Sequence, residues 1–331
     1  MNKVISLNKR PIGKPTLSDF KFTEEEMPVS HLGEIFLKTL YVSVDPYLRG
    51  RMNDSKSYVP PFVLGQPIQS GCIAEVVESS IHEFKKGDFV SGNLDWKEYQ
   101  VSTGKGLSHI DADASELSRY LGILGMTGLT AYFGLVEVAD PKEGETIVVS
   151  GAAGAVGSVV GQLGKILGCR VVGITGSDEK VELLKSKFKF DEAINYKTTP
   201  DLNAAIKNAC HNGVDIYFDN VGGEISDAVL MNINKHACIS ICGAISLYNE
   251  TKQPVGPRVQ PILLTKSATM RGFIISDFAY RFEEGITELA MWLKEGKLTY
   301  SETIVEGFDK LPQAFLDLFD GKNEGKMIVK V

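Results

Sequence analysis

Short hydrophobic runs, interrupted by Gly and Pro, fill the first 122 residues of the chain. Examples are EIFLKTLYVSVDP (34–46), GCIAEVVESS (71–80) and WKEYQVS (96–102). Runs of this length, rich in β-branched and aromatic residues and bounded by turn residues, predict β-strands. TIVEGF (303–308) and KMIVKV (326–331) have the same character. The chain is therefore predicted to end in the β-rich unit with which it begins.

The pattern changes between residues 123 and 297, where strands alternate with amphipathic helices. ETIVVSG predicts the first strand, and CRVVGIT, EAINY, GVDIYFDNVGG, ACISICG and TMRGFII predict the following ones. After the first strand, apolar residues recur at helical spacing: Val156, Val159, Val160, Leu163 and Leu167. The alternation is typical of right-handed βαβ units. We predict an α/β fold with a doubly wound parallel sheet in 123–297 and a β-rich domain formed by 1–122 and 298–331.

Charge and composition exclude several classes of protein. The net charge of -7 over 331 residues argues against a nucleic-acid or membrane partner, because nothing could neutralise a run of phosphates. The first residues, MNKVISLNKR, lack the apolar core of a secretory signal, so a cytoplasmic protein is expected. The uncharged stretches 120–136 and 146–164 contain too many glycines for a membrane helix, although Gly157-x-x-x-Gly161 resembles a membrane dimer motif.

The stretch SGAAGAVGSVVGQ (150–162) follows a predicted strand and opens a predicted helix. The dinucleotide fingerprint needs a tight turn, then a glycine that lets the backbone approach the pyrophosphate, then a small residue for packing. Gly154 and Gly157 fill the second and third places, whereas Ala152 takes the first, with Gly151 beside it. The helix N-terminus would attract phosphates. The alternative is a glycine-rich helix that only packs tightly on a sheet.

The end of the second strand decides which dinucleotide fits. NAD sites place Asp or Glu there for the ribose 2'-hydroxyl, but this chain has ITGS (174–177). No carboxylate would repel a 2'-phosphate, and Lys180 in the next turn could attract one. NADPH is therefore favoured over NADH. The alternative is that Lys180 is only a surface lysine.

These motifs resemble one branch of the medium-chain dehydrogenase/reductase superfamily. It is the zinc-free prostaglandin reductase and leukotriene dehydrogenase branch, which includes alkenal and curcumin double-bond reductases. The matching blocks run in family order over nearly the whole chain: VSVDPYLRGRM, LGQPIQSG, GMTGLTAYFGL, SGAAGAVGSVVGQ, GSDEK, NYK, YFDNVGG, CGAISLYN, MRGFIISDF and GKNEGKMIVKV. The resemblance implies that 123–297 is a Rossmann dinucleotide-binding domain, that 1–122 and 298–331 form a GroES-like substrate domain, and that the protein is a homodimer.

Zinc-dependent members of the superfamily need metal ligands that this chain lacks. They resemble alcohol dehydrogenase, with a Cys near residue 40, a Gly-His-Glu block near residue 65 and a four-cysteine lobe. This chain has YVSVDP and LGQP there, and no cysteine between 73 and 168. The five cysteines are odd in number and scattered, so free thiols are expected. Cys238 and Cys242 lie on one face of a predicted strand but have no further ligand nearby. We predict no metal.

The resemblance also implies roles for individual residues. Gly154, Ala155, Val156 and Gly157 would contact the pyrophosphate, and Lys180 and Tyr196 the 2'-phosphate. The residues that would line the ribose and nicotinamide are Asn220, Cys242, Gly243, Ala244, Ile245, Ser246, Tyr248, Phe273, Ile274, Ile275 and Asn323. Taken alone, several have simpler explanations, such as a turn former for Asn220 and a loop residue for Asn323.

A metal-free nicotinamide site can reduce the double bond of an α,β-unsaturated ketone or aldehyde if a donor stabilises the developing enolate. Tyr248 is the candidate donor, and the α-carbon takes its proton from Tyr248 or water. Tyr47, Arg49 and Arg51 would shape the substrate cleft or simply pack. Some relatives have a tyrosine after PIQ, where this chain has Ser70. Two alternatives remain: an NADPH-dependent quinone oxidoreductase, and a sensor or structural protein that binds NADPH without turnover.

Overall fold

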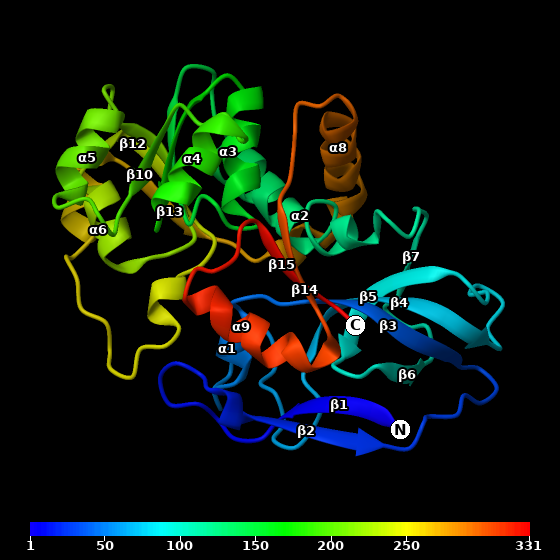
Figure 1. The fold of residues 1–331 in the computed structure, drawn as a ribbon. Coiled ribbons are helices and arrows are strands. Elements are labelled where there is room, and N and C mark those ends of the chain that lie inside the picture. The colour runs from blue at the N-terminus through cyan, green and yellow to red at the C-terminus, as the bar shows by residue number, and fades with distance from the viewer. The chain divides into compact units, whose positions relative to one another are not determined.

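The computed structural model describes all 331 residues, and the chain forms two compact units. The first unit comprises Met1–Leu121, Thr303–Asn323 and Met327–Val331, and the second comprises Gly122–Glu302 and Glu324–Lys326. Figure 1 shows the elements of both units along the chain. The second unit therefore receives one short segment, Glu324–Lys326, from the C-terminal part of the chain.

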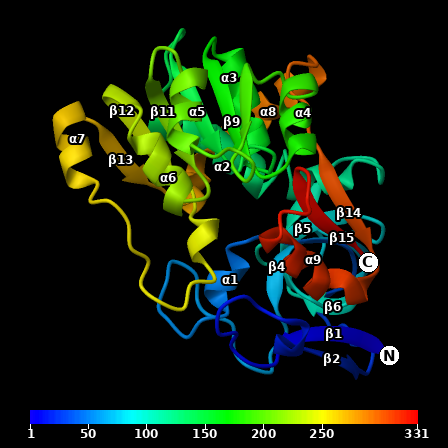
Figure 2. The ribbon, with the colours of Figure 1, turned by 60° about the vertical axis from the view of Figure 1, so that its left-hand side comes forward.

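The second unit is built on six parallel strands. They are β8 (Thr146–Ser150), β9 (Arg170–Thr175), β10 (Glu192–Asn195), β11 (Val214–Asp219), β12 (Ile233–Ile241) and β13 (Thr269–Gly272). Their order in the sheet is β10-β9-β8-β11-β12-β13. Figure 2 labels four of these strands, β9, β11, β12 and β13. Numbered from the first strand of the unit, this is 3-2-1-4-5-6, the order of dinucleotide-binding sheets. The predicted doubly wound parallel sheet is confirmed.

Helices cover both faces of this sheet. Successive residues of a strand point to opposite sides, and because the strands are apolar on both sides, each face needs a cover. Ile147 and Val149 pack in one apolar cluster, and Val148 packs in the other. The first cluster includes residues of α2 (Met126–Phe133), α3 (Gly157–Ile166), α4 (Asp178–Ser186) and α8 (Phe282–Lys294). The second includes residues of α5 (Leu202–Ala209), α6 (Gly223–Leu230) and α7 (Gln260–Lys266).

The glycines of α3 serve the contact between helix and sheet. A Cβ at Gly161 would overlap the ring of Phe190, and one at Gly164 would lie 2.8 Å from Cδ1 of Ile147. The membrane-like Gly157-x-x-x-Gly161 spacing thus reflects close packing inside this unit. None of the helices has the length and apolar character needed to cross a membrane.

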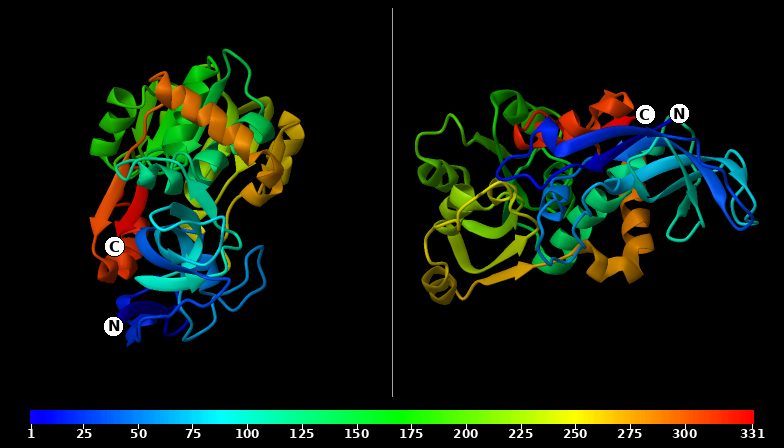
Figure 3. Two further views of the ribbon diagram at one scale, coloured as in Figure 1. Left: turned by 90° about the vertical axis from the view of Figure 1, so that its right-hand side faces the viewer. Right: turned by 90° about the horizontal axis from the view of Figure 1, so that it is seen from below.

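The first unit contains a seven-stranded sheet and a hairpin. The sheet order is β14 (Glu302–Glu306), β15 (Lys326–Lys330), β3 (Ile35–Ser43), β4 (Gln69–Ser79), β5 (Phe89–Asp95) and β7 (Ser108–Ile110), with β6 (Tyr99–Ser102) also paired to β3. β1 (Asn2–Leu7) pairs with β2 (Phe20–Glu25) in antiparallel fashion. The two termini lie near one another in both views of Figure 3.

Two sequence predictions need correction, one of a strand end and one of a whole segment. β13 ends at Gly272, so TMRGFII does not remain a strand through Phe273–Ile275. The last thirty residues were predicted to be β in character, but α9 spans Leu311–Phe319 between β14 and β15. Leu311, Phe315 and Leu318 of this helix are buried and recur at helical spacing. The helix was missed because the strands before and after it dominate the hydrophobic pattern of this part of the chain. Helix α1 (Leu48–Arg51) is a single turn.

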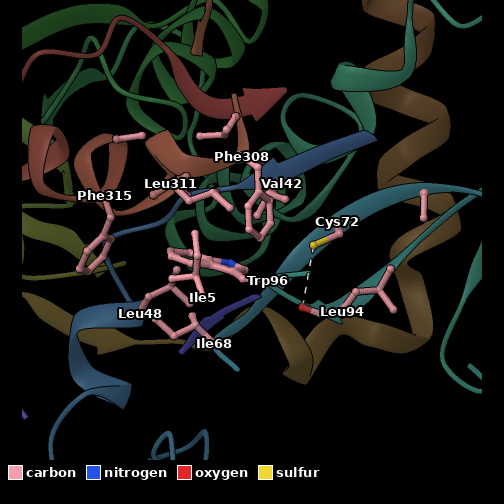
Figure 4. Packing of buried hydrophobic residues seen from close by; sticks show 14 of the residues in the cluster. Ile5, Val42, Leu48, Ile68, Cys72, Leu94, Trp96, Phe308, Leu311 and Phe315 are labelled. Carbon is pink, nitrogen blue, oxygen red and sulfur yellow. Dashed lines mark hydrogen bonds between the residues drawn. The ribbon is translucent and has the colours of Figure 1, made fainter. Parts of the chain in front are cut away.

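Trp96 stands at the centre of the first unit's core (Figure 4). The indole is fully buried, and its Nε1 donates a hydrogen bond of 2.8 Å to Oγ of Ser70. Cys72 lies in the same core, where its thiol donates weakly to the carbonyl of Leu94. Burial raises the pKa of the Cys72 thiol to about 12. All five cysteines are free. Ser70 thus anchors the core tryptophan.

Candidate cofactor site

The sheet of the second unit has its switch point between β8 and β11. These strands are neighbours, but the helix after β8 packs on one face and the helix after β11 packs on the other. In open α/β sheets, ligands bind outside the carboxyl ends of the strands at such a point. Ser150 ends β8 and Asp219 ends β11, so the candidate site begins at these two residues.

The glycine loop after β8 meets the geometric needs of a pyrophosphate turn. Gly151 has φ of 59°, a left-handed conformation that suits glycine. A Cβ at Gly157 would overlap the Gly151 carbonyl oxygen and lie 2.8 Å from Cα of Ala152. Gly154 is less crowded, because its Cβ would approach a single atom, the Gly151 oxygen, at 3.2 Å. Gly157 therefore provides the close packing, and Gly154 leaves its outer side open.

Ala152 fits the loop because Gly151 makes the turn. The Ala152 side chain is fully buried, and its N–H donates to the carbonyl of Ile174 at 3.1 Å. A methyl group is accommodated there, next to Gly173 of β9. The departure from the glycine fingerprint is thus compatible with the loop conformation.

The N-terminus of α3 is open to an anion. The helix begins at Gly157 with Val156 at the N-cap, and no side chain caps it. The N–H groups of Ser158 and Val160 donate to the carbonyls of Gly154 and Val156, and this end of the helix carries the positive end of the helix dipole. Ala155 and Val156, which precede the helix, are half-buried. This end of α3 can hold a pyrophosphate.

A segment from the far end of the chain lies against the glycine loop. We call Glu324–Lys326 the C-terminal strap. The N–H of Gly325 donates to the carbonyl of Ala153 at 2.8 Å, and Gly325 forms an isolated parallel bridge with Gly154. Gly325 has φ of 61°, and a Cβ there would overlap the carbonyl oxygen of Ser301. The strap was not predicted, because nothing in the sequence near residues 324–326 points to residue 154.

Basic side chains gather beyond the ends of β9 and β10. Ser177 caps α4 by accepting a hydrogen bond from the N–H of Lys180. A Cβ on Gly176 would lie 3.2 Å from Cε1 of Tyr196 and 3.3 Å from Cε of Lys197. Burial lowers the pKa of the Lys180 ammonium, the Glu324 carboxylate raises it, and the Lys197 charge lowers it again. The predicted pair Lys180 and Tyr196 thus shares one corner with Lys197 and Glu324, which the sequence analysis did not single out.

Asp219 organises the end of β11. Its carboxylate is buried, and Oδ1 accepts hydrogen bonds from Oγ of Ser150 at 3.0 Å and from the hydroxyl of Tyr217 at 2.8 Å. The same oxygen accepts from the N–H groups of Val221 at 2.9 Å and Gly222 at 2.8 Å. The turn after β11 is therefore folded around one carboxylate oxygen.

Asn220 connects this turn to the strand beside it. Its Nδ2 donates to the Ser150 carbonyl at 2.8 Å, and its N–H donates to Oγ of Ser150 at 3.0 Å. Asn220 therefore ties the turn after β11 to the end of β8. Its position next to β8 also places it at the switch point.

The loop that carries Tyr248 is tied to the same turn. The carbonyl of Asp219 accepts from the N–H groups of Cys242 at 2.9 Å and Gly243 at 3.1 Å. The Tyr248 hydroxyl accepts a hydrogen bond from the N–H of Ala244 at 3.3 Å. Burial raises the pKa of the Tyr248 phenol. The phenol is therefore neutral at pH 7 and keeps its own proton to donate.

Ile245 and Ser246 follow in a short 3-10 helix that is fixed to the turn after β11. The Ile245 N–H donates to the carbonyl of Asn220 at 3.3 Å, and Oγ of Ser246 donates to the carbonyl of Val221 at 2.6 Å. The structure thus brings Asn220 and residues 242–248 together at the carboxyl end of β11.

Phe273, Ile274 and Ile275 are half-buried and follow β13. The ring of Phe273 packs edge-to-face on Phe218, with ring centroids 6.3 Å apart, and on Phe278 at 6.4 Å. Ile274 is the N-cap of the 3-10 helix that begins at Ile275. The aromatic contacts fix this segment outside the carboxyl end of the sheet.

The remaining candidate residues belong to the first unit. Arg49 is buried, and its guanidinium donates to Oδ1 of Asn53 at 2.7 Å and to the carbonyl of Gly13 at 2.9 Å. Arg51 donates to the carbonyls of Pro60 at 3.0 Å and Gln69 at 3.2 Å. Both guanidinium groups thus hold loops of their own unit.

Tyr47 and Asn323 also lie in the first unit. Tyr47 packs against the core of that unit, and burial raises the pKa of its phenol. Asn323 directly precedes the C-terminal strap in the chain. Neither residue belongs to the unit that carries the glycine loop.

No group of three or more His, Cys, Asp or Glu side chains in the chain has a metal-binding arrangement. Cys238 donates weakly to the carbonyl of Val138 at 3.4 Å. Burial raises the pKa of the Cys242 thiol to about 12, which disfavours the thiolate that zinc requires. The two cysteines pack with the apolar residues around them.

Two family models match the chain: the N-terminal domain of oxidoreductases over residues 3–110, and the zinc-binding dehydrogenase domain over 155–291. The chain is 44% identical to the NADP(+)-dependent 2-alkenal reductase of Nicotiana tabacum over 100% of this chain and 97% of that protein. It is 41% identical to the NADPH-dependent curcumin reductase of Escherichia coli (strain K12), over 98% and 95%.

A solved structure agrees with these relatives. The crystal structure of CurA from Vibrio vulnificus in complex with NADPH has a TM-score of 0.95 and 42% identity, and the match covers 99% of both chains. Identity at this level over almost the full length establishes common descent and a common fold. The chain therefore belongs to the medium-chain dehydrogenase/reductase superfamily, in the branch of the prostaglandin, 2-alkenal and curcumin reductases.

Proposed function

We propose that this chain reduces the carbon–carbon double bond of α,β-unsaturated ketones and aldehydes with NADPH, and that Tyr248 donates a hydrogen bond to the substrate oxygen. One observation supports this proposal above all. Three features lie at the carboxyl ends of one sheet: the N-terminus of α3, the corner that contains Lys180, and the loop that carries Tyr248. By family, the chain is an NADP-dependent oxidoreductase that acts on CH–CH groups.

The residues present fit NADPH. The first turn of α3 and the glycine loop would hold the pyrophosphate, because Gly154 leaves the backbone accessible there. Lys180, with Tyr196 and Lys197 nearby, would bind the 2'-phosphate. The segment 242–248, Asn220, residues 273–275 and Asn323 would surround the ribose and nicotinamide. Bound NADPH supplies the hydride that the β-carbon of the substrate accepts.

Tyr248 stabilises the charge that develops on the substrate oxygen. Its oxygen already accepts the N–H of Ala244, so the orientation of the phenol is fixed and its proton is free to point at a ligand. Because burial raises the pKa of the phenol, the donor stays protonated at neutral and mildly alkaline pH. Preorganised donors of this kind lower the barrier for reactions that pass through an oxyanion.

We also propose that no zinc takes part, although one matching family model is described as zinc-binding. The support is the absence of ligands at the positions that the zinc enzymes use, together with the buried thiols of Cys238 and Cys242. Metal analysis of the purified protein should find far less than one zinc per chain, and a chelator should leave activity unchanged. Stoichiometric zinc would contradict this proposal.

The test of the main proposal is NADPH consumption with a graded panel of enals, cyclic enones, prostanoid-like ketones and quinones. Enones and enals should be the better substrates, and Tyr248→Phe should lower kcat by about 100-fold with little change in NADPH affinity. Faster turnover of quinones would instead identify a quinone oxidoreductase. NADPH binding without oxidation across the panel would identify a sensor or structural protein.

We also propose a homodimer, which the family resemblance implies, and a cytoplasmic location. Sedimentation equilibrium of the purified protein tests the first, with a mass of twice 36.1 kDa as the expected result. Cell fractionation tests the second. A monomer at micromolar concentration would contradict the dimer.

A further inference from the structure

The C-terminal strap holds an acidic side chain in a fixed place beside the glycine loop. Gly325 donates to Ala153 at 2.8 Å and pairs with Gly154, and its left-handed backbone and contact with Ser301 leave no room for a Cβ. The position of the next residue back, Glu324, is therefore determined by the same contacts. Glu324 is exposed to solvent.

The charge of Glu324 acts on Lys180. Apart from burial, the groups that influence the Lys180 ammonium are Glu324, of opposite charge, and Lys197, of like charge. The corner that would take the 2'-phosphate thus contains two cations and one anion. A phosphate monoester carries about -1.5 to -2 charge at pH 7, and it must share these cations with the carboxylate.

A carboxylate in this corner favours a cofactor with a free ribose 2'-hydroxyl over one with a 2'-phosphate. NAD-binding sheets place a carboxylate at the end of the second strand, where it accepts the ribose 2'-hydroxyl. β9 of this chain ends in Thr175 and is followed by Gly176 and Ser177, none of them acidic. Glu324 brings a carboxylate to the same corner from a segment about 150 residues later in the chain.

We propose that Glu324 is a specificity-determining residue that competes with the cofactor 2'-phosphate for Lys180 and so narrows the preference for NADPH over NADH. This inference depends on the proposed NADPH site. Removal of the negative charge should increase the affinity for NADPH, which carries the 2'-phosphate, and should leave the affinity for NADH unchanged. The signature is therefore a change in the ratio of two affinities rather than in either one alone.

The test is a fluorescence titration of NADPH and NADH with wild-type protein, Glu324→Gln and Glu324→Lys. Glu324→Gln should tighten NADPH binding by about two- to five-fold, the size expected for one exposed charge pair, without tightening NADH binding. Glu324→Lys should tighten NADPH binding further. The gain should shrink at 0.5 M salt, because salt screens exposed charges.

Two controls isolate the mechanism. Glu283→Gln removes one exposed carboxylate from α8, which is not among the groups that influence Lys180, and should change neither affinity. In a Lys180→Met background, Glu324→Gln should no longer change the NADPH affinity by more than about 1.5-fold, because the coupled partner is gone. Thermal melting of each variant confirms that the chain is folded.

Several results would overturn the inference. Unchanged NADPH affinity in folded Glu324→Gln would do so, as would an equal gain for NADPH and NADH, or a full gain in the Lys180→Met background. If the wild-type protein binds neither cofactor, the proposed function fails and this inference fails with it. If NADPH binds and only the Glu324 effect is missing, the proposed function stands without this inference.

Discussion

Asp219 offers a sharp test of how the candidate site is held together. One carboxylate oxygen accepts four hydrogen bonds, from Ser150, Tyr217, Val221 and Gly222, and the residue is 2% exposed. Asp219→Asn preserves the shape of the side chain but removes its charge. Asp219→Ala removes the acceptor altogether.

The magnitude follows from the number of donors. A hydrogen bond to a charged group contributes about 1.5–3 kcal/mol and a neutral one about 1 kcal/mol. Because bonds that share one acceptor are not additive, we expect Asp219→Asn to lower the free energy of unfolding by about 2–4 kcal/mol. Asp219→Ala leaves buried donors without a partner and should cost about 5 kcal/mol, at the upper end for a single substitution.

The assay is urea-induced unfolding followed by circular dichroism, with NADPH titration of each folded variant. Asp309→Asn is the matched control, because Asp309 is an exposed carboxylate that pairs with Lys3 at 3.3 Å, and its change should stay within about 0.5 kcal/mol. NADPH binding should weaken in Asp219→Asn, since Asn220 and the Tyr248 loop depend on the same turn. An unfolding midpoint equal to that of the control would refute the reasoning.

Three further predictions concern the glycine loop, the basic corner and the buried thiols. Gly157→Ala forces a Cβ against backbone atoms and should weaken NADPH binding in titrations by about 10- to 100-fold, more than Gly154→Ala does. Lys180→Glu should weaken NADPH binding by at least about tenfold while NADH affinity changes little; unchanged NADPH affinity would contradict the assignment. Burial raises the pKa of Cys72 and Cys242 from 9.0 to about 12, so the unfolded chain loses these protons first and stability should fall between pH 9 and pH 12. Urea midpoints at pH 8, 9.5 and 11 test this, and constant midpoints would contradict it.

The fold was predictable because its signals are local. Strands such as Thr146–Ser150 are continuous apolar runs, and α3 repeats apolar residues at helical spacing. Ser177 caps α4, and a serine directly before a helix is a local signal of the same kind. α9 was missed because a short helix between two strands changes the pattern for only nine residues.

The long-range parts of the site were not predictable from spacing. The strap pairs with the glycine loop although about 170 residues of sequence separate them. The pairing requires a glycine at position 325, because a Cβ there would overlap the carbonyl oxygen of Ser301, and only the folded structure reveals that contact. Lys197 joins the Lys180 corner because β9 and β10 are adjacent and parallel, a relation that sequence order suggests but does not fix. Arg49 is chemically suited to bind a ligand, yet in the fold its donors are engaged by Asn53 and Gly13.

Ala152 explains why the glycine fingerprint should be judged by conformation rather than by position. The turn after β8 needs one residue with positive φ, and Gly151 supplies it. Ala152 then points into the sheet, where its methyl fills space beside Gly173 and its N–H binds Ile174. The site that must lack a side chain is Gly157, where any Cβ meets backbone that cannot move away without opening the loop. Ala152→Gly should therefore leave NADPH affinity within about twofold of wild type and lower stability by roughly 1 kcal/mol, the opposite ranking from a strict reading of the motif.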